Sequence, residues 1–264
     1  MINFEVLKPI RIAELDLALS YFPKTGRVLE IGAGAGWQAK YISQKGYEVS
    51  AIDINNNSYE VEESYPIIKY DGFNIPFPDA YFDVVFSSNV LEHIPHVVEF
   101  QNEIRRVIKD NGTVIHLVPT NLWKFWATIL QYPMFFRMGF KWLMSKAGIK
   151  QSEKNKTYNN TLFMNEVNEK YKNLGFFSLL LRILPRKHGE RGNYFTEYYY
   201  FTKKAWVNVF KPHFTVNQYL TNDLFYTGNG TLPPTFSIHN RRLASNWLGS
   251  ACHIFVLSPN KTKN

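Results

Sequence analysis

Three alternating glycines follow a short apolar run near the start of the chain, and this arrangement constrains the fold more than any other feature of the sequence. Residues 28–31 read Val-Leu-Glu-Ile, and residues 32–36 read Gly-Ala-Gly-Ala-Gly. The apolar run predicts a buried strand, and the residues from Gln38 onward predict a helix. Glycine permits unusual backbone angles and a close approach to a ligand. The segment therefore predicts a strand, a tight turn and a helix whose free N–H groups face a ligand.

The position of the third glycine bears on which ligand this turn binds. In a dinucleotide-binding fingerprint the third glycine stands three positions after the second, where the helix packs closely on the strand. Here that position is Trp37, and the third glycine is Gly36. Glu30 stands near the end of the strand, where a carboxylate repels a pyrophosphate and attracts a cation. The sequence thus favours a ligand with positive charge near the turn over a nicotinamide dinucleotide.

A second carboxylate, Asp53, directly follows the next expected strand, residues 47–52. It lies about twenty residues beyond Gly32, at the spacing where an acidic side chain binds the ribose hydroxyls of a nucleotide. Asp53 could instead cap a turn, because asparagines occupy positions 55–57.

Further apolar runs alternate with helical patterns along the chain. We expect helices at residues 10–22, 38–46, 97–108 and 202–210, and further strands at residues 67–70, 81–88, 114–118, 214–220 and 253–257. Strands that alternate with helices predict right-handed crossovers and a parallel sheet. The expected fold is therefore α/β, a Rossmann-like, doubly wound, seven-stranded and mostly parallel sheet, with its ligand beyond the carboxyl ends of the strands.

The segment from Val28 to Gly36 resembles motif I of the class I S-adenosylmethionine-dependent methyltransferases, of the type 11 kind. The segments that follow match in order and spacing, so the resemblance covers roughly residues 25–120. It implies S-adenosylmethionine as the cofactor and S-adenosylhomocysteine as the product. It also implies that the last two strands form an antiparallel edge, with the final strand inserted between its neighbours.

The resemblance also assigns cofactor contacts. An aspartate after the third strand, here Asp71, meets the amine of adenine, and an apolar neighbour, here Phe73, meets the ring. Asp71 followed by glycine is also an ordinary turn signal. The full set implied to bind the cofactor is Glu30, Gly32, Ala33, Gly34, Gly36, Asp53, Ile54, Asp71, Gly72, Phe73, Ser88 and Asn89.

A general base helps methyl transfer to a hydroxyl, and histidine suits that role near neutral pH. His93 follows the fourth expected strand and therefore lies near the expected methyl group, although it could simply be part of the wall of the site. His96 would complete a His-x-x-His pair with it. No further metal-ligand cluster accompanies this pair, so we expect no metal site.

A second candidate base lies in residues 186–194, which combine basic residues, a histidine, a carboxylate and glycines. This stretch resembles a His-Gly-Glu segment of methyltransferase-like proteins from bacterial surface-polysaccharide gene clusters. That resemblance implies that His188 is the base and that Glu190 orients it. Arg186, Lys187 or Arg191 would then meet a phosphate on a sugar carrier. The alternative is a solvated basic loop.

The sequence pattern changes after Pro119, where residues 121–149 become dense in aromatic and basic residues. We expect a cofactor-binding part at residues 1–120, an inserted helical lid that binds the acceptor at 121–195, and the completion of the sheet at 196–264. The lid tryptophans, Trp123, Trp126 and Trp142, could pack over the cofactor or dock on an anionic membrane.

Composition limits the remaining possibilities. The net charge of +8 permits an anionic partner, although it also serves solubility. The single cysteine, Cys252, excludes an intramolecular disulfide and fits a reducing compartment. No secretory signal or membrane-spanning run is evident, so we expect a cytoplasmic protein, peripheral at the inner face of the membrane if the lid docks there. Nucleic acid is not the expected substrate, because no Asn/Asp-Pro-Pro-Tyr-like segment follows the fourth strand.

These observations predict an enzyme that transfers a methyl group in line from S-adenosylmethionine to a small or carrier-linked acceptor, with a sugar hydroxyl as the favoured acceptor. The alternative is a non-catalytic regulatory or partner subunit that binds S-adenosylmethionine or S-adenosylhomocysteine. The sequence leaves the acceptor atom and the oligomeric state open.

Overall fold

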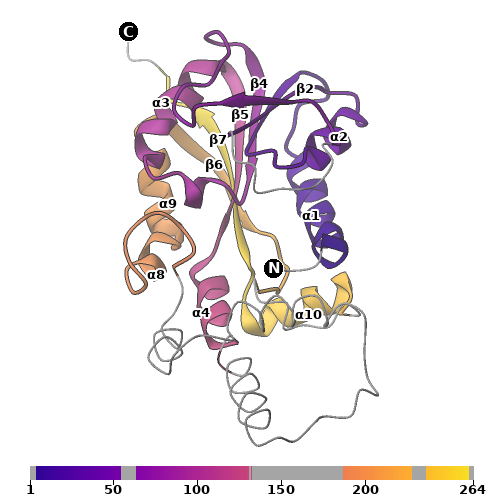
Figure 1. Ribbon diagram of the computed structural model, residues 1–264, viewed down its shortest axis with the longest axis vertical. Coiled ribbons are helices and arrows are strands. Elements are labelled where there is room, and N and C mark those ends of the chain that lie inside the picture. Colours follow the sequence, from indigo (N-terminus) through magenta and orange to yellow (C-terminus); the bar gives the residue numbers. More distant parts are fainter. Residues whose placement is uncertain (1–3, 55–63, 131, 133–186, 228–235, 262–264) are drawn as a thin grey trace, which may run out of the picture. The chain divides into compact units, whose positions relative to one another are not determined.

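A single seven-stranded sheet organises the protein. The computed structural model describes residues 4–54, 64–130, 132, 187–227 and 236–261. The strand order is β3-β2-β1-β4-β5-β7-β6 (Figure 1). The first five strands pair in parallel, and β7 lies antiparallel between β5 and β6. This is the predicted doubly wound sheet, including the inserted final strand.

The secondary structure elements have the following bounds. The strands are β1 (Arg27–Ile31), β2 (Glu48–Ile54), β3 (Ile67–Tyr70), β4 (Phe82–Ser88), β5 (Ile108–Pro119), β6 (Phe214–Thr221) and β7 (Cys252–Pro259). The helices are α1 (Phe4–Leu19), α2 (Trp37–Ser43), α3 (Val97–Val107), α4 (Asn121–Ile129), α8 (Glu197–Tyr200), α9 (Lys203–Phe210) and α10 (Ile238–Leu248). A short 3-10 helix, η1 (Leu91–His93), follows β4.

Several element boundaries differ from the sequence expectations. β2 continues to Ile54, so Asp53 lies inside the strand instead of ending it. α1 begins before residue 10 and continues through Pro9, although proline removes one helical hydrogen bond. Helix α10 was not predicted, because apolar residues such as Leu243 and Trp247 face solvent and obscure the period of its buried face.

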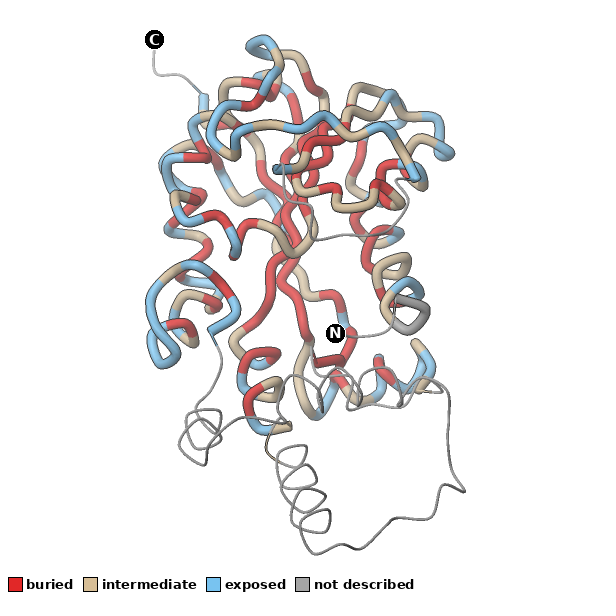
Figure 2. Tube along the Cα trace, viewed as in Figure 1, coloured by how far each residue is buried: buried red, intermediate tan, exposed pale blue. Residues whose placement is uncertain are grey.

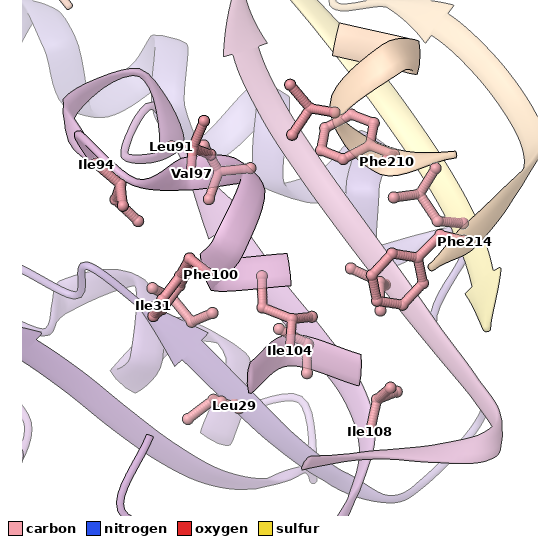
Figure 3. Packing of buried hydrophobic residues seen from close by; sticks show 14 of the residues in the cluster. Leu29, Ile31, Leu91, Ile94, Val97, Phe100, Ile104, Ile108, Phe210 and Phe214 are labelled. Atoms are coloured by element: carbon pink, nitrogen blue, oxygen red, sulfur yellow. The ribbon is translucent and has the colours of Figure 1, made fainter. Parts of the chain in front are cut away.

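Side chains of the strands alternate between the two faces of the sheet and bury separate clusters. Leu29 and Ile31 of β1 pack with residues of α3 and α9, such as Phe100 and Phe210 (Figure 3). Val28 points to the other face, in the cluster that includes residues of α1 and α2. Helices α3 and α9 accordingly lie on one side of the sheet, and α1 and α2 on the other (Figure 1). Figure 2 shows that the central strands are buried along most of their length.

The expected lid lies largely outside the described residues. The chain divides into two compact units, residues 1–127 with 187–264 and residues 128–186, and nearly all of the second is not described. The lid prediction therefore stays a prediction. None of the helices in the described ranges is long and apolar enough to cross a bilayer.

The first turns of α4 test part of the prediction for the tryptophans. Trp123 is buried, and Trp126 Nε1 donates a hydrogen bond to the Leu248 carbonyl at 2.8 Å. Docking of Trp123 on a membrane is therefore wrong, because its ring packs inside the domain. Trp142 lies outside the described residues.

We expect Phe100→Ala to lower the free energy of unfolding by about 3–5 kcal/mol, because it empties a fully buried site beneath the sheet. Val98→Ala is the matched control on the same helix, since Val98 is 41% exposed, and it should change stability by less than about 0.5 kcal/mol. Urea unfolding of both variants measures the difference. Equal effects of the two substitutions would contradict the packing described for α3.

Candidate functional site

The glycine turn lies directly against the segment that follows β4. Gly32 has a φ of +73°, and a Cβ added there would overlap the side chain of Val90. Only glycine therefore lets the two segments approach this closely. A Cβ at Gly34 would meet no atom of the described residues within 4 Å, so these residues leave space beside the turn at that position. The turn thus has room for a ligand next to its backbone.

Glu30 is a buried carboxylate at this turn. It is 1% exposed, and its Oε1 accepts a hydrogen bond from Gln38 Nε2 at 3.2 Å. Its Oε2 is buried and has no hydrogen-bond partner among the described residues. Burial raises the pKa of Glu30 to about 8, although hydrogen bonds from Gln38 and the Ala39 N–H lower it. A cationic group, such as the ammonium of an amino acid, would satisfy the unpaired oxygen, so the residues here fit a ligand of that kind.

Asp53 is fixed to the glycine turn. Its Oδ2 accepts a hydrogen bond from the Gly34 N–H at 2.5 Å. This contact agrees with the alternative interpretation that Asp53 caps a turn, and ribose binding by the same carboxylate stays a prediction. Ile54, the next residue, ends β2 and is 47% exposed.

Asp71 caps its own turn after β3. Its Oδ1 accepts hydrogen bonds from the N–H groups of Phe73 and Asn74, and its Oδ2 accepts one from Asn74 Nδ2. These bonds hold the pKa of Asp71 below its usual range. The Phe73 ring stacks on His96 with centroids 4.1 Å apart, and His96 Nε2 donates to the Gly72 carbonyl. The contacts of Asp71 are those of a turn, and its role at adenine stays a prediction.

The turn after β4 redirects the chain toward a second polar cluster. Asn89 follows Ser88 with a φ of +55°, a conformation that asparagine tolerates better than most residues. The Asn89 N–H donates to the Leu117 carbonyl at 2.9 Å. This turn brings Val90 onto Gly32 and leads into η1, which contains Glu92 and His93.

The second cluster consists of Glu92, His93 and His188, which we call the Glu92 cluster. Glu92 is 1% exposed, and neither carboxylate oxygen has a hydrogen-bond partner in the described part of the chain. Its Oε1 lies 3.9 Å from His93 Nε2 and 4.0 Å from His188 Nε2. The sequence prediction singled out both histidines, and the structure brings them together with their rings 4.9 Å apart.

Burial sets the protonation states in the Glu92 cluster. Burial raises the pKa of Glu92 to about 8. Burial lowers the pKa of His188 to about 3, with further effects of His93, Lys124 and Arg11. Burial also lowers the pKa of His93. Both imidazoles are therefore neutral near pH 7, with a lone pair on one ring nitrogen of each.

A buried ion pair holds the loop that carries His188. Glu197 Oε1 accepts hydrogen bonds from the N–H groups of His188 and Gly189 at 2.8 Å and 2.5 Å. The other oxygen of Glu197 pairs with Lys124 of α4. The Glu190 N–H donates to the Glu92 carbonyl at 2.7 Å, and a Cβ on Gly189 would lie 2.8 Å from that same oxygen. Glycine at 189 therefore lets the loop dock on η1.

The described residues include no hydrogen bond from the Glu190 carboxylate to His188, so the orientation of His188 by Glu190 stays a prediction. The Glu190 carboxylate is 50% exposed and lies 3.7 Å from Lys187 Nζ. The carboxylate beside His188 Nε2 is Glu92. Glu190 was predicted because it is close to His188 in the sequence, whereas Glu92 is close to His188 only in the folded chain.

Sequence reasoning missed a buried network next to the Glu92 cluster. Arg11 Nη1 donates to Glu14 Oε2 at 2.7 Å, and the Tyr226 hydroxyl donates to Glu14 Oε1 at 2.8 Å. Tyr226 also contacts Cys252 Sγ at 3.0 Å, and Cys252 donates to Asn89 Oδ1. The one signal in the sequence is that Arg11 and Glu14 stand three residues apart on a helix, at the spacing of an ion pair.

Comparison with known protein families gives a match to the part of the chain that runs from β1 into β5. Residues 29–116 match the family model of a methyltransferase domain, which ends within β5. An uncharacterized methyltransferase from Mycobacterium leprae is 30% identical over 113 residues, which cover 39% of this chain and 41% of that protein. The chain thus spans less than half the length of the curated relatives it matches.

Solved structures share the fold. A structure of the complex between the Haloferax volcanii Trm112 methyltransferase activator and the putative methyltransferase matches with a TM-score of 0.54 at 11% identity, over 98% of this chain and 93% of that chain. A putative S-adenosylmethionine-dependent methyltransferase from Listeria monocytogenes matches with a TM-score of 0.50 at 12% identity, over 95% of this chain and 100% of that chain. At these identities the likeness establishes the fold.

We expect Glu30→Gln to raise the free energy of unfolding near pH 9 but not near pH 5. The folded-state pKa of Glu30 is about 8, above the ordinary value of 4.5, so the wild-type protein loses stability as the pH rises between these values. The neutral amide avoids that loss, which is on the order of a few kcal/mol by urea unfolding. Glu48→Gln, at an exposed site on β2, is the control. An equal gain in both variants would contradict the burial of Glu30.

The family match and the sheet order agree. The matched residues contain the glycine turn, Glu30, Asp53 and η1, and the sheet around them has the inserted antiparallel strand that the resemblance implied. Residues 29–116 match the methyltransferase-domain family to which the resemblance in the sequence also points, and the strands that complete their sheet follow the order that this resemblance implied.

Proposed function

We propose that this protein transfers a methyl group from S-adenosylmethionine to a hydroxyl oxygen of a small or carrier-linked acceptor, with a sugar hydroxyl as the favoured acceptor. The observation that carries this proposal is the position of the Glu92 cluster beside the glycine turn. Val90 contacts Gly32, and Glu92 follows two residues later. Groups able to hold a proton thus adjoin the expected cofactor position.

The residues at the glycine turn fit the amino-acid and ribose parts of the cofactor. Glu30 Oε2 is buried without a partner among the described residues, which suits the cofactor ammonium. Asp53 is tied to the turn through Gly34 and is the candidate for the ribose hydroxyls. When bound, the cofactor supplies a methyl group that its positive sulfonium already activates. The main contribution of the protein is therefore alignment and the exclusion of water.

The Glu92 cluster supplies a place for the acceptor proton. The acceptor oxygen forms a bond to the methyl carbon while the bond from carbon to sulfur breaks and its electron pair stays on sulfur. The hydroxyl must lose its proton in this process. The neutral imidazole of His93 can take up that proton, with His188 beside it, and an amine acceptor would need such a group less.

The loop that carries His188 supports an anionic acceptor. Lys187 lies 34% exposed beside Glu190. The Arg191 guanidinium stacks 4.5 Å from the Tyr200 ring centroid, and its Nη1 is buried without a hydrogen-bond partner among the described residues. A guanidinium with an unpaired donor suits a phosphate, such as one on a sugar carrier. Arg186, the third basic residue expected there, lies outside the described residues.

The ligand that co-purifies with the protein, and the affinity for S-adenosylmethionine, test the cofactor assignment. We expect S-adenosylmethionine or S-adenosylhomocysteine to co-purify with the protein and to be detected by mass spectrometry. In calorimetric titrations Glu30→Gln should weaken S-adenosylmethionine binding by about 10-fold or more, because it removes a charged hydrogen-bond acceptor. Glu48→Gln should bind as the wild type does. A co-purifying nicotinamide dinucleotide would overturn the proposal.

Turnover tests the reaction and the acceptor. The protein should form S-adenosylhomocysteine steadily with nucleotide-linked or lipid-linked sugars, and the methyl group should be found on oxygen by mass spectrometry of the product. His188→Asn should lower kcat more than it changes cofactor binding, because His188 lies at the acceptor side. Tight cofactor binding with no turnover on any hydroxyl acceptor would instead support a regulatory or partner subunit.

A further inference from the structure

We propose that the Glu92 cluster binds a divalent transition-metal ion through Glu92, His93 and His188. One ligand atom from each of these residues lies within 4.8 Å of the other two. A metal with ligands at about 2.0–2.2 Å holds neighbouring ligand atoms roughly 3 to 3.6 Å apart. Modest side-chain rotations of the two histidines, whose side chains are 46% and 37% exposed, would close the difference.

Among the described residues, the charged side chains near Glu92 each have a partner of opposite sign. The charged side chains that act on it are Arg11 and Glu197. Arg11 is bonded to Glu14, and Glu197 pairs with Lys124. Glu92 is therefore a buried carboxylate whose neighbouring charges already have partners of opposite sign. Burial of a carboxylate without a hydrogen-bond partner is costly, and a bound cation would remove that cost.

The surrounding residues position the ligands in advance. Glu197 fixes the backbone at His188 and Gly189, and the Trp123 ring lies 4.6 Å from the His188 ring. The Glu190 N–H fixes the backbone of Glu92 through its carbonyl. Metal sites depend on such outer contacts to orient their ligands.

The structure changes which histidines could bind a metal. The sequence suggested His93 with His96 and, for lack of further ligands, no metal. In the fold His96 donates to the Gly72 carbonyl and stacks on Phe73, so it is engaged elsewhere. His188, which is distant in the sequence, takes the place beside His93, and Glu92 completes a set of three. This combination could not be recognised from spacing along the chain.

The ligand set indicates the kind of metal and what it would bind. Two imidazoles and one carboxylate suit Zn²⁺, Co²⁺ or Fe²⁺, whereas Mg²⁺ and Ca²⁺ prefer oxygen ligands. Three protein ligands leave coordination positions open, and the hydroxyl oxygen of an acceptor could fill one of them. With the metal bound, the pKa of that hydroxyl would fall and its proton would pass to water, whereas the uptake of the proton by the His93 imidazole, as proposed above, applies to the metal-free protein.

The presence of the site is independent of the proposed function, and only its role in activating the acceptor rests on that function. Accordingly, metal binding is measured without cofactor or acceptor. The test uses the full chain after metals have been removed with EDTA. Zn²⁺ binding is followed by calorimetry, and Co²⁺ binding is followed by visible absorption. We expect one equivalent to bind, with Co²⁺ bands typical of four or five ligands.

Variants identify the ligands. Loss of a residue that only orients a ligand lowers metal affinity by about 10–100-fold. Loss of a ligand itself should cost at least as much as the upper end of this range, so Glu92→Gln and His188→Asn should each lower the affinity by at least about 100-fold. His239→Asn, at an exposed site on α10, is the matched control and should bind as the wild type does. Circular dichroism checks that each variant is folded. Affinities unchanged in folded Glu92 and His188 variants would overturn the proposal.

A measurement on the wild-type protein needs no variant. X-ray absorption of the zinc-loaded protein should show two imidazole ligands with oxygen and no sulfur. A sulfur ligand would assign the ion to Cys252, and an absence of saturable Zn²⁺ or Co²⁺ binding would also overturn the proposal. If the protein binds S-adenosylhomocysteine but no metal, the metal site is wrong and the proposed function still holds. If it binds metal but no S-adenosylhomocysteine, the metal site holds and the proposed function is wrong.

Discussion

The contact between Gly32 and Val90 is the constraint on which the candidate site depends. Parallel pairing of β1 with β4 brings the carboxyl ends of both strands to one edge of the sheet. At that edge the glycine turn and the segment after β4 meet without space for a side chain at position 32. The same contact therefore fixes the position of the glycine turn relative to that of Glu92, which lies two residues beyond Val90.

The sequence predicted the sheet well because each strand carries its own local signal. The apolar runs of β3 and β4 and the glycines after β1 each lie within a short stretch of the chain. The spacing of apolar residues along each helix reflects the face that the helix buries. The prediction of Asp53 as a cofactor residue used its spacing from Gly32, and that of Asp71 used the family resemblance. In the structure both carboxylates hold turns, which spacing does not distinguish from ligand binding.

The Glu92 cluster could be predicted only in part, because its members come together through tertiary contacts. Both histidines stood out as polar residues in plausible places, but Glu92 carries no signal beyond its adjacency to His93. The roles of Lys124 and Glu197 were hidden because each charge lies in an aromatic stretch, and only their mutual pairing makes burial favourable. Lys124 and Glu197 are 73 positions apart in the sequence, so their pairing can be recognised only from the fold.

The ion pair between Lys124 and Glu197 has a further consequence for how this protein can vary. Lys124 lies shortly before the unit of residues 128–186, and His188 and Glu197 lie shortly after it. The two chain ends that border this unit are therefore clamped to each other within the methyltransferase domain. A change in the length of the intervening segment would therefore leave His188 and its neighbours in place. The clamp thus holds the loop of His188 in place independently of the residues between the two ends.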